Sequence, residues 1–81
     1  MSKSKKEMLI KSGIALYGER WQTELARSLG LSDGRRIRQW LSGDRPIPEG
    51  TWEDIEKLLA NKRIILNETL VAIKRYIPAQ D

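Results

Sequence analysis

The chain has 81 residues, contains neither cysteine nor histidine, and carries a formal charge of +4. This length predicts one domain, residues 1–81, with a small hydrophobic core. The missing residue types exclude a disulfide framework, a thiolate metal site and a histidine that acts as a base or activates a nucleophile. The sequence also lacks a glycine-rich phosphate loop and a convincing carboxylate pair, so we expect neither an enzyme nor a bound metal or cofactor.

The positive charge is concentrated in the first half of the chain. Residues 1–45 hold ten Lys and Arg against five Asp and Glu, whereas residues 46–81 hold five against six. A basic half favours a polyanion-binding face, although a merely basic, solvated surface has the same composition. The sequence lacks the apolar run of a signal peptide or of a membrane span, which takes about 18 residues. We therefore expect a cytoplasmic protein with no membrane association.

The first element that the sequence predicts is a helix over residues 4–17. Ser4 and Glu7 have the spacing of a capping box, in which each side chain satisfies a free N–H at a helix start. Gly18 ends the pattern, because glycine readily takes the left-handed conformation. Gly13 lies within this helix, where it costs about 1 kcal/mol relative to alanine. We interpret it as a site of close packing against another helix.

Two short helical patterns follow, over residues 21–29 and 33–41, with Gly30 between them. Trp21 is predicted to be a core residue that holds the first helix against the second. In the second pattern, three apolar residues at helical spacing form a stripe that we expect to be buried: Ile37, Trp40 and Leu41.

The face opposite this stripe is rich in long hydrogen-bonding side chains. At about 100° per residue, Arg35 and Gln39 point most directly away from the stripe, and Arg36 and Arg38 flank them. In a DNA major groove, arginine can bond bidentately to guanine and glutamine to adenine. We therefore predict Arg35 and Gln39 as base contacts, whereas Arg36 and Arg38 either read bases or hold phosphates. A solvated face is the usual role of such charges, but no acidic residue after Asp33 balances these arginines within the helix.

The rest of the chain is also helical in pattern. Pro46 and Pro48 keep residues 42–50 out of a helix, and helical periodicity resumes at Thr51 and continues to residue 77. Whether Asn61 separates two helices or lies within one long helix is left open by the sequence. Together these elements predict an all-α fold, a compact bundle of about five helices.

The C-terminal segment, residues 61–77, carries more apolar surface than a small core needs. Four of its side chains form a stripe at helical spacing: Leu66, Leu70, Ile73 and Ile77. Two interpretations remain open at this point. The stripe either forms a dimer interface or packs back over the first helix.

The central stretch resembles the helix-turn-helix of the phage repressor and Cro-like DNA-binding domains, the lambda-repressor-like fold. The resemblance rests on residues of both helices and of the turn: Leu25, Ala26, Leu29, Gly30, Leu31, Ile37 and Trp40. The flanking runs 17–26 and 40–48 look like those of small phage and prophage regulators. The separation of Gly30 from Ile37 is one residue longer than in the usual motif, and we expect Gly34 to let the backbone absorb the insertion.

The resemblance implies binding to double-stranded DNA, with the second helix of the motif in the major groove. Family members often place a glutamine against phosphate at the position of Gln22. Free N–H groups at helix starts also attract phosphates, so we predict phosphate contacts around both helices from Gln22, Thr23, Ser32, Ser42 and Arg45. Such proteins usually bind as homodimers to the two halves of an inverted repeat. The expected function is a transcriptional regulator, a repressor or autorepressor of a small phage or mobile-element operon.

A second class of function remains open. The same unit could belong to an antitoxin, or to another protein-binding module that grips its partner through residues 61–77. RNA binding is not expected, because the sequence offers no obvious exposed aromatic platform for stacking bases.

Overall fold

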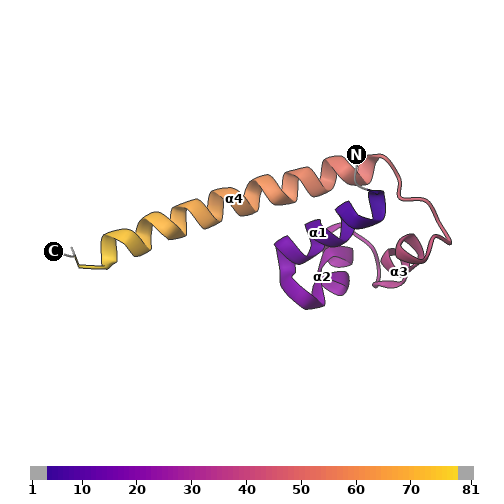
Figure 1. The fold of residues 1–81 in the computed structure, drawn as a ribbon, viewed down its shortest axis with the longest axis horizontal. Helices are drawn as coiled ribbons and strands as arrows, with labels where there is room; N and C mark the ends of the chain where they lie inside the picture. Colours follow the sequence, from indigo (N-terminus) through magenta and orange to yellow (C-terminus); the bar gives the residue numbers. More distant parts are fainter. Residues whose placement is uncertain (1–3, 79–81) are drawn as a thin grey trace.

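The computed structural model describes residues 4–78, and all regular secondary structure within this range is helical. In chain order the elements are α1 (Lys5–Tyr17), the 3₁₀ turn η1 (Gly18–Arg20), α2 (Trp21–Ser28), α3 (Arg35–Ser42) and α4 (Gly50–Tyr76). The all-α prediction is confirmed. Helices α1, α2 and α3 form one small body, and α4 starts on that body and extends well beyond it (Figure 1). The predicted compact bundle of about five helices is therefore wrong, and residues 1–3 and 79–81 of the predicted domain lie outside the described range.

One continuous helix, α4, takes the place of the last two predicted helices. Residues 51–77 contain neither proline nor glycine, so no residue of this stretch interrupts the helical hydrogen bonding. Asn61 lies within α4, which answers the question left open by the sequence. The helix ends at Tyr76, and the next residue, Ile77, has a ψ of 127°, the extended conformation favoured before proline. Although α4 is long, no helix within residues 4–78 has both the length and the apolar character needed to cross a membrane.

The ends of α1 follow local signals in the sequence. The Ser4 hydroxyl accepts a hydrogen bond from the backbone N–H of Glu7 at 3.1 Å, which is one half of the predicted capping box. At the other end, Gly18 has a φ of 79° and donates its N–H to the carbonyl of Ile14. The turn η1 then connects α1 to α2.

The buried core joins α1, α2, α3, the following loop and the start of α4. Its apolar members are Leu9, Leu16, Trp21, Leu25, Ala26, Ile37, Trp40, Ile47 and Ile55. Trp21 lies directly against Gly13, because a Cβ added to Gly13 would come within 2.0 Å of the Trp21 ring. The glycine within α1 therefore makes room for the indole. Both the core role of Trp21 and the close-packing interpretation of Gly13 are confirmed.

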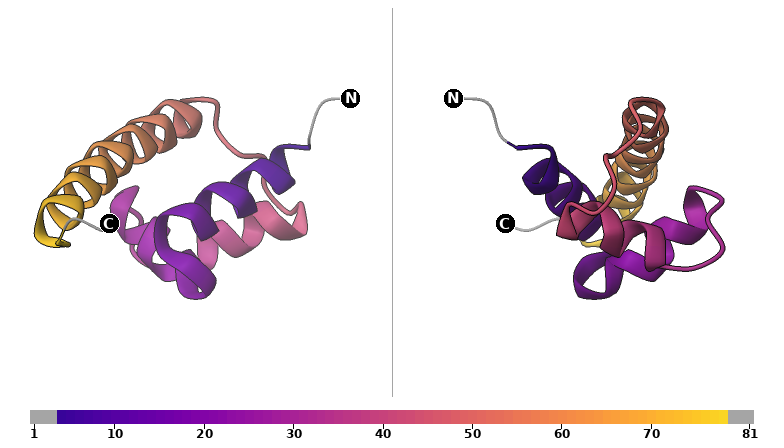
Figure 2. Two further views of the ribbon diagram at one scale, coloured as in Figure 1. Left: turned by 60° about the vertical axis from the view of Figure 1, so that its left-hand side comes forward. Right: turned by 90° about the vertical axis from the view of Figure 1, so that its right-hand side faces the viewer.

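Only the N-terminal part of α4 contributes to the core. Ile55 is buried, and Lys62 Nζ donates a hydrogen bond to the carbonyl of Leu16 at 3.1 Å, near the C-terminal end of α1 where a cation is favoured. Every residue from 63 to 78 is exposed, and this part of α4 projects away from the body in Figure 1. The views in Figure 2 foreshorten α4 and show the grouping of α1, α2 and α3. The apolar stripe within residues 66–77 therefore does not pack back over α1.

Replacing Gly13 by alanine tests the contact between α1 and α2. Alanine favours the helix by about 1 kcal/mol, but its Cβ would overlap the enclosed Trp21 ring, and overpacking costs about 1–3 kcal/mol or more. We expect Gly13→Ala to lower the free energy of unfolding by about 1–2 kcal/mol in urea denaturation. Gly50→Ala is the matched control, because no atom lies within 4 Å of a Cβ at Gly50. Equal stability of the two variants would contradict the packing described.

Candidate nucleic-acid interface

Gly30 determines how the chain leaves α2. Its φ of 79° is left-handed, and the N–H groups of Gly30 and Leu31 donate to the carbonyls of Arg27 and Ala26 at 3.1 and 2.8 Å. These two bonds form a Schellman motif, which satisfies carbonyls at a helix C-terminus. Leu31 also packs against the core, so the direction of the turn is fixed at both its backbone and its side chain.

The longer turn is accommodated immediately before α3. This helix begins at Arg35, later than predicted, and the Asp33 carboxylate accepts a hydrogen bond from the Arg35 N–H at 2.9 Å. Gly34 has an ordinary φ of −77°, so the expectation that its backbone freedom absorbs the insertion is wrong. Gly34 is buried instead. A Cβ there would lie 3.2 Å from the Arg38 guanidinium and 3.9 Å from the Thr23 hydroxyl, so Gly34 lies next to both side chains.

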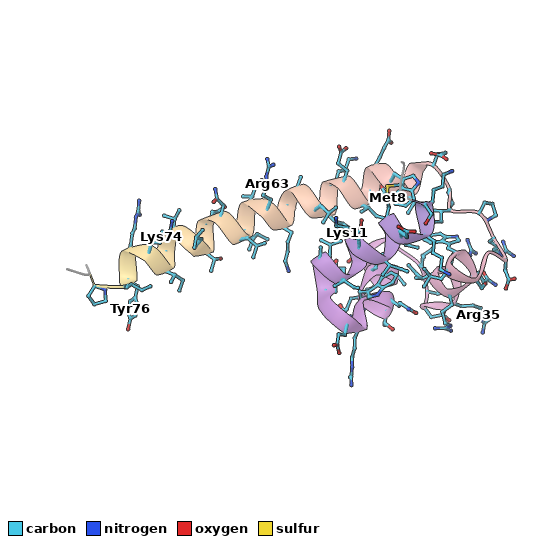
Figure 3. All side chains as sticks on the ribbon, in the orientation of Figure 1. Met8, Lys11, Arg35, Arg63, Lys74 and Tyr76 are labelled. Carbon is cyan, nitrogen blue, oxygen red and sulfur yellow. The ribbon has the colours of Figure 1, made fainter. Side chains whose placement is uncertain are left out.

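One side of α3 is fixed in the core, and the opposite side is free. Ile37 has no exposed surface and Trp40 has 6%, whereas Leu41 packs against the core and is partly exposed. Gly43 ends the helix with a φ of 87°. Because the inner stripe is anchored, helix geometry determines where the outer side chains point. Arg35 projects away from α1 and α4 (Figure 3).

A polar hollow of about 290 Å³ lies on the free side of α3. It is lined by residues of α3, the preceding turn and the following loop: Leu31, Ser32, Asp33, Arg35, Arg36, Gln39 and Arg45. We call this surface the α3 hollow. It unites three of the four predicted base contacts with two of the predicted phosphate contacts, Ser32 and Arg45. Three guanidinium groups face one carboxylate, and this excess of positive charge suits phosphates and the acceptor edge of guanine.

Arg38 lies apart from the α3 hollow, on the flank of α3 that faces α2. Its guanidinium is close to Gly34 on the side where the Thr23 hydroxyl lies. Gln22 and Thr23 belong to the first turn of α2, where no side chain caps the free N–H groups. Such a helix start can receive a phosphate. The start of α2 and Arg38 therefore form a second polar patch, which we call the α2 patch.

Ser42 differs from the other predicted phosphate contacts. Its hydroxyl donates to the carbonyl of Gln39 at 3.2 Å and accepts a hydrogen bond from the N–H of Asp44 at 3.4 Å. These bonds stabilise the C-terminal end of α3, so the hydroxyl already has a structural role. A phosphate contact from Ser42 stays a prediction.

The sequence suggests Ser32 or Asp33 as the cap of the helix after Gly30, and Asp33 has this role; its place in the α3 hollow was not predicted. Helical periodicity describes only residues within a helix, and Asp33 precedes the first turn of α3. An aspartate two residues before Arg35 readily accepts a bond from a helix-start N–H, and the carboxylate does so here. The acid both holds the start of α3 and lowers the positive charge of the hollow.

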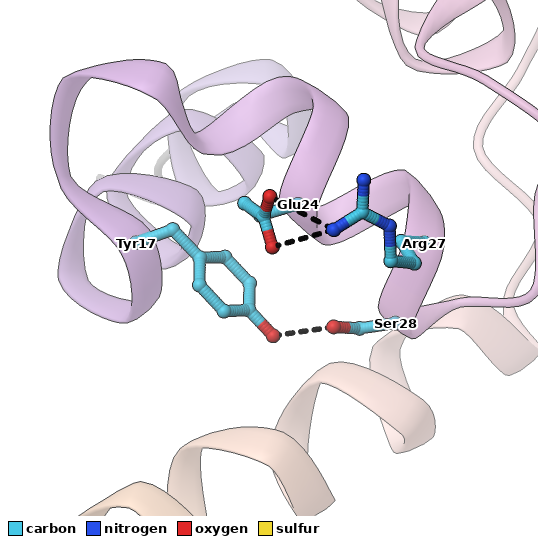
Figure 4. A network of polar contacts seen from close by, with 4 residues as sticks. All are labelled: Tyr17, Glu24, Arg27 and Ser28. Carbon is cyan, nitrogen blue, oxygen red and sulfur yellow. Dashed lines mark hydrogen bonds and ion pairs between the residues drawn. The ribbon is translucent and has the colours of Figure 1, made fainter.

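A separate polar network ties α1 to α2 on another part of the surface (Figure 4). The hydroxyl groups of Tyr17 and Ser28 are hydrogen-bonded to each other, and Glu24 forms an ion pair with Arg27 at 3.1 Å. An exposed pair of this kind contributes at most about 1 kcal/mol. Arg27 is thus engaged within α2 and does not line the α3 hollow.

Comparisons with protein-family models, with curated proteins and with solved structures gave no significant match. Residues 4–78 contain no cluster of three or more acidic side chains that could hold a metal ion. The chemistry of the α3 hollow therefore has to be inferred from its own side chains.

Two substitutions of Asp33 separate its hydrogen bond from its charge. Asp33→Ala removes the acceptor for the Arg35 N–H, and we expect it to lower the free energy of unfolding by about 0.5–1 kcal/mol, as for loss of a helix cap. Asp33→Asn keeps an oxygen acceptor and should retain most of that stability. Urea denaturation of the two variants checks this expectation. Equal destabilisation would mean that the hydrogen bond does not hold the start of α3.

Proposed function

We propose that this chain is a sequence-specific regulator that binds double-stranded DNA, with α2 and α3 as the two helices of a helix-turn-helix. The observation that carries the proposal is the α3 hollow. It gathers side chains that pair with base edges and phosphates on the free side of a helix whose other side is buried in the core. The resemblance of the same stretch to phage repressor and Cro-like domains supports the proposal.

The free side of α3 has the chemistry needed in a major groove, which admits one α-helix. Arg35 and Arg36 can each bond to O6 and N7 of a guanine, and Gln39 can bond to N6 and N7 of an adenine. Ser32 and Arg45 line the same hollow. In the proposed complex they hold neighbouring phosphates and so fix the register of α3 on the bases.

The α2 patch supplies the second attachment to the DNA backbone. The uncapped start of α2 offers free N–H groups and the positive end of a helix dipole. Gln22 and Thr23 lie at this start, and Arg38 is the arginine of α3 on the side of Thr23. We therefore assign Arg38 to a phosphate and keep Arg36 as a base contact.

The regulatory mechanism that follows is simple occlusion. A homodimer on an inverted repeat doubles the number of bases read and restricts binding to the operator. Occupying the operator excludes polymerase, which makes the protein a repressor, and an autorepressor where the operator precedes its own gene. A small phage or mobile-element operon in the cytoplasm is the setting that the resemblance implies.

An antitoxin or another protein-binding module is the second candidate function. The observation that favours it is the exposed apolar side of α4 beyond Lys62, which a partner protein could cover. The two functions are compatible, since the chain could bind DNA through α3 while it binds a toxin through α4. A role in protein binding alone predicts no affinity for DNA, and this separates it from the first candidate.

The dependence of affinity on salt tests whether phosphates are bound. Each neutralised phosphate adds about −0.9 to the slope of log K against log salt. With two arginine–phosphate contacts in each copy, from Arg38 and Arg45, we expect a slope of about −2 per copy. Fluorescence anisotropy with labelled duplex DNA measures it. An affinity that does not change between low and high salt would show that the chain neutralises no phosphates.

Replacing Arg35 by alanine tests whether α3 reads bases. We expect Arg35→Ala to cost about 1–3 kcal/mol on the preferred site and to relax the preference at one base position. Arg63→Ala is the matched control, because Arg63 is an exposed arginine of α4 and should change neither quantity. If Arg35→Ala instead weakens binding to all sequences equally, Arg35 contacts a phosphate.

A further inference from the structure

The apolar side of α4 continues past the end of the body, interrupted only by Lys62 and Thr69, which lie on the same side at about 100° per residue. Near the start of the helix this side faces the core, where Ile55 is 2% exposed. At about 100° per residue, four later side chains lie in line with Ile55: Leu66, Leu70, Ile73 and Ile77. These four are 48–58% exposed. We call residues 63–77 the α4 overhang.

The α4 overhang exposes more apolar surface than a solvated helix needs. Scattered apolar residues are ordinary on a protein surface, whereas a contiguous patch marks an interaction site. The overhang is about 22 Å long at 1.5 Å per residue, and Ile65 and Tyr76, also exposed, lie beside the four stripe residues.

We propose that the α4 overhang binds the α4 overhang of a second copy of this chain, with the two helices antiparallel. The inference rests on the dimer of the proposed function and deepens it, because it specifies the surface and the direction of pairing. The stripe is complementary to itself when one helix is reversed. Leu66 then meets Ile77 of the second copy, and Leu70 meets Ile73 of the second copy, so that all four side chains in each copy are covered.

The position of α1 determines the direction of pairing. Up to Lys62, the apolar side of α4 is covered by its own body, and the bond from Lys62 to the Leu16 carbonyl marks the end of that contact. A parallel partner would have to place its own residues 50–62 in the space that α1 occupies. An antiparallel partner overlaps only the α4 overhang, and each body lies outside the paired segment (Figure 1).

The charges of the overhang agree with the antiparallel direction. Lys74 and Arg75 form a cationic last turn in α4. In a parallel pair these two turns would lie level with each other and repel. In the antiparallel pair, the two cationic turns lie toward opposite ends of the paired segment, and the two helix dipoles oppose each other favourably.

Antiparallel pairing also constrains the DNA site. The pair is centred between residues 71 and 72, so the starts of the two α4 helices lie about 64 Å apart along the paired helices. Helix α3 lies near that end of the molecule (Figure 1). Half-sites spaced by a single helical turn, about 34–36 Å, are too close for this dimer, so the expected half-sites lie more than one turn apart.

Disulfide cross-linking of the full chain tests the pairing directly, because the natural sequence contains no cysteine. One variant carries Leu66→Cys and a size tag, and the other carries Ile77→Cys without a tag. Mixed and oxidised, they should form a cross-linked dimer of mixed size. Leu66→Cys alone should not cross-link, because the two cysteines would lie about 16 Å apart in the antiparallel pair, beyond the reach of a disulfide. Ile64→Cys is the control on the opposite side of the overhang, with a similar exposure of 54%.

Three results would overturn the inference. Cross-linking of Leu66→Cys to itself, without the mixed product, would show parallel helices. Equal cross-linking of Ile64→Cys would show that the stripe does not specify the contact. A monomeric mass for the unmodified chain in sedimentation would show that the occupant is another protein or none.

A sedimentation experiment on the double variant Leu70→Asp with Ile73→Asp completes the test. We expect its mass to be half that of the unmodified dimer. A retained helical circular dichroism signal would show that the variant is still folded. A variant that is still dimeric would overturn the inference. All of these experiments are done without DNA, so they test the dimer separately from the proposed function. An antiparallel dimer without affinity for DNA would contradict only the proposed function. A monomer that binds a specific DNA site would contradict only this inference.

Discussion

The burial of one side of α3 is the constraint on which the candidate site depends. Ile37 has no exposed surface and lies in the same core as Leu25 and Ala26 of α2, which are also fully buried. Removing a large side chain from such a core costs about 2–5 kcal/mol, so α3 cannot rotate about its axis without a loss comparable to the stability of a small domain. The outward direction of Arg35 and Gln39 is therefore a consequence of apolar packing on the other side of the helix.

One amphipathic pattern in α4 serves two purposes. Around Ile55, its apolar side is covered by the body and contributes to the core. Beyond Lys62 the same side has no cover within the described chain, although the backbone continues as a regular helix. Helix geometry thus places folding surface and interaction surface on a single rigid element. In the proposed dimer, the distance between the two reading helices is set by the length of that element.

Much of the fold was predictable where a local signal decides the structure. The left-handed turn at Gly30 and the buried side at Ile37 follow from residue type and spacing. The continuity of α4 through Asn61 was not predictable, because a polar residue at that position is compatible with a helix or a break. Helical periodicity also predicted the directions in which the arginines of α3 point, but not which residues of other segments lie next to them. The separation of Arg38 from the α3 hollow, and the place of Asp33 within it, depend on contacts with other segments.

The central claim is that the free side of α3 reads a specific sequence of double-stranded DNA. Selection of bound duplexes from a random pool, followed by sequencing, tests it most directly. We predict one enriched motif, with guanine and adenine positions matching the arginines and Gln39 of the α3 hollow, and loss of that motif when Arg35 and Gln39 are both replaced by alanine. A pool that remains random with the unmodified protein, or a motif that the double variant enriches unchanged, would contradict the claim.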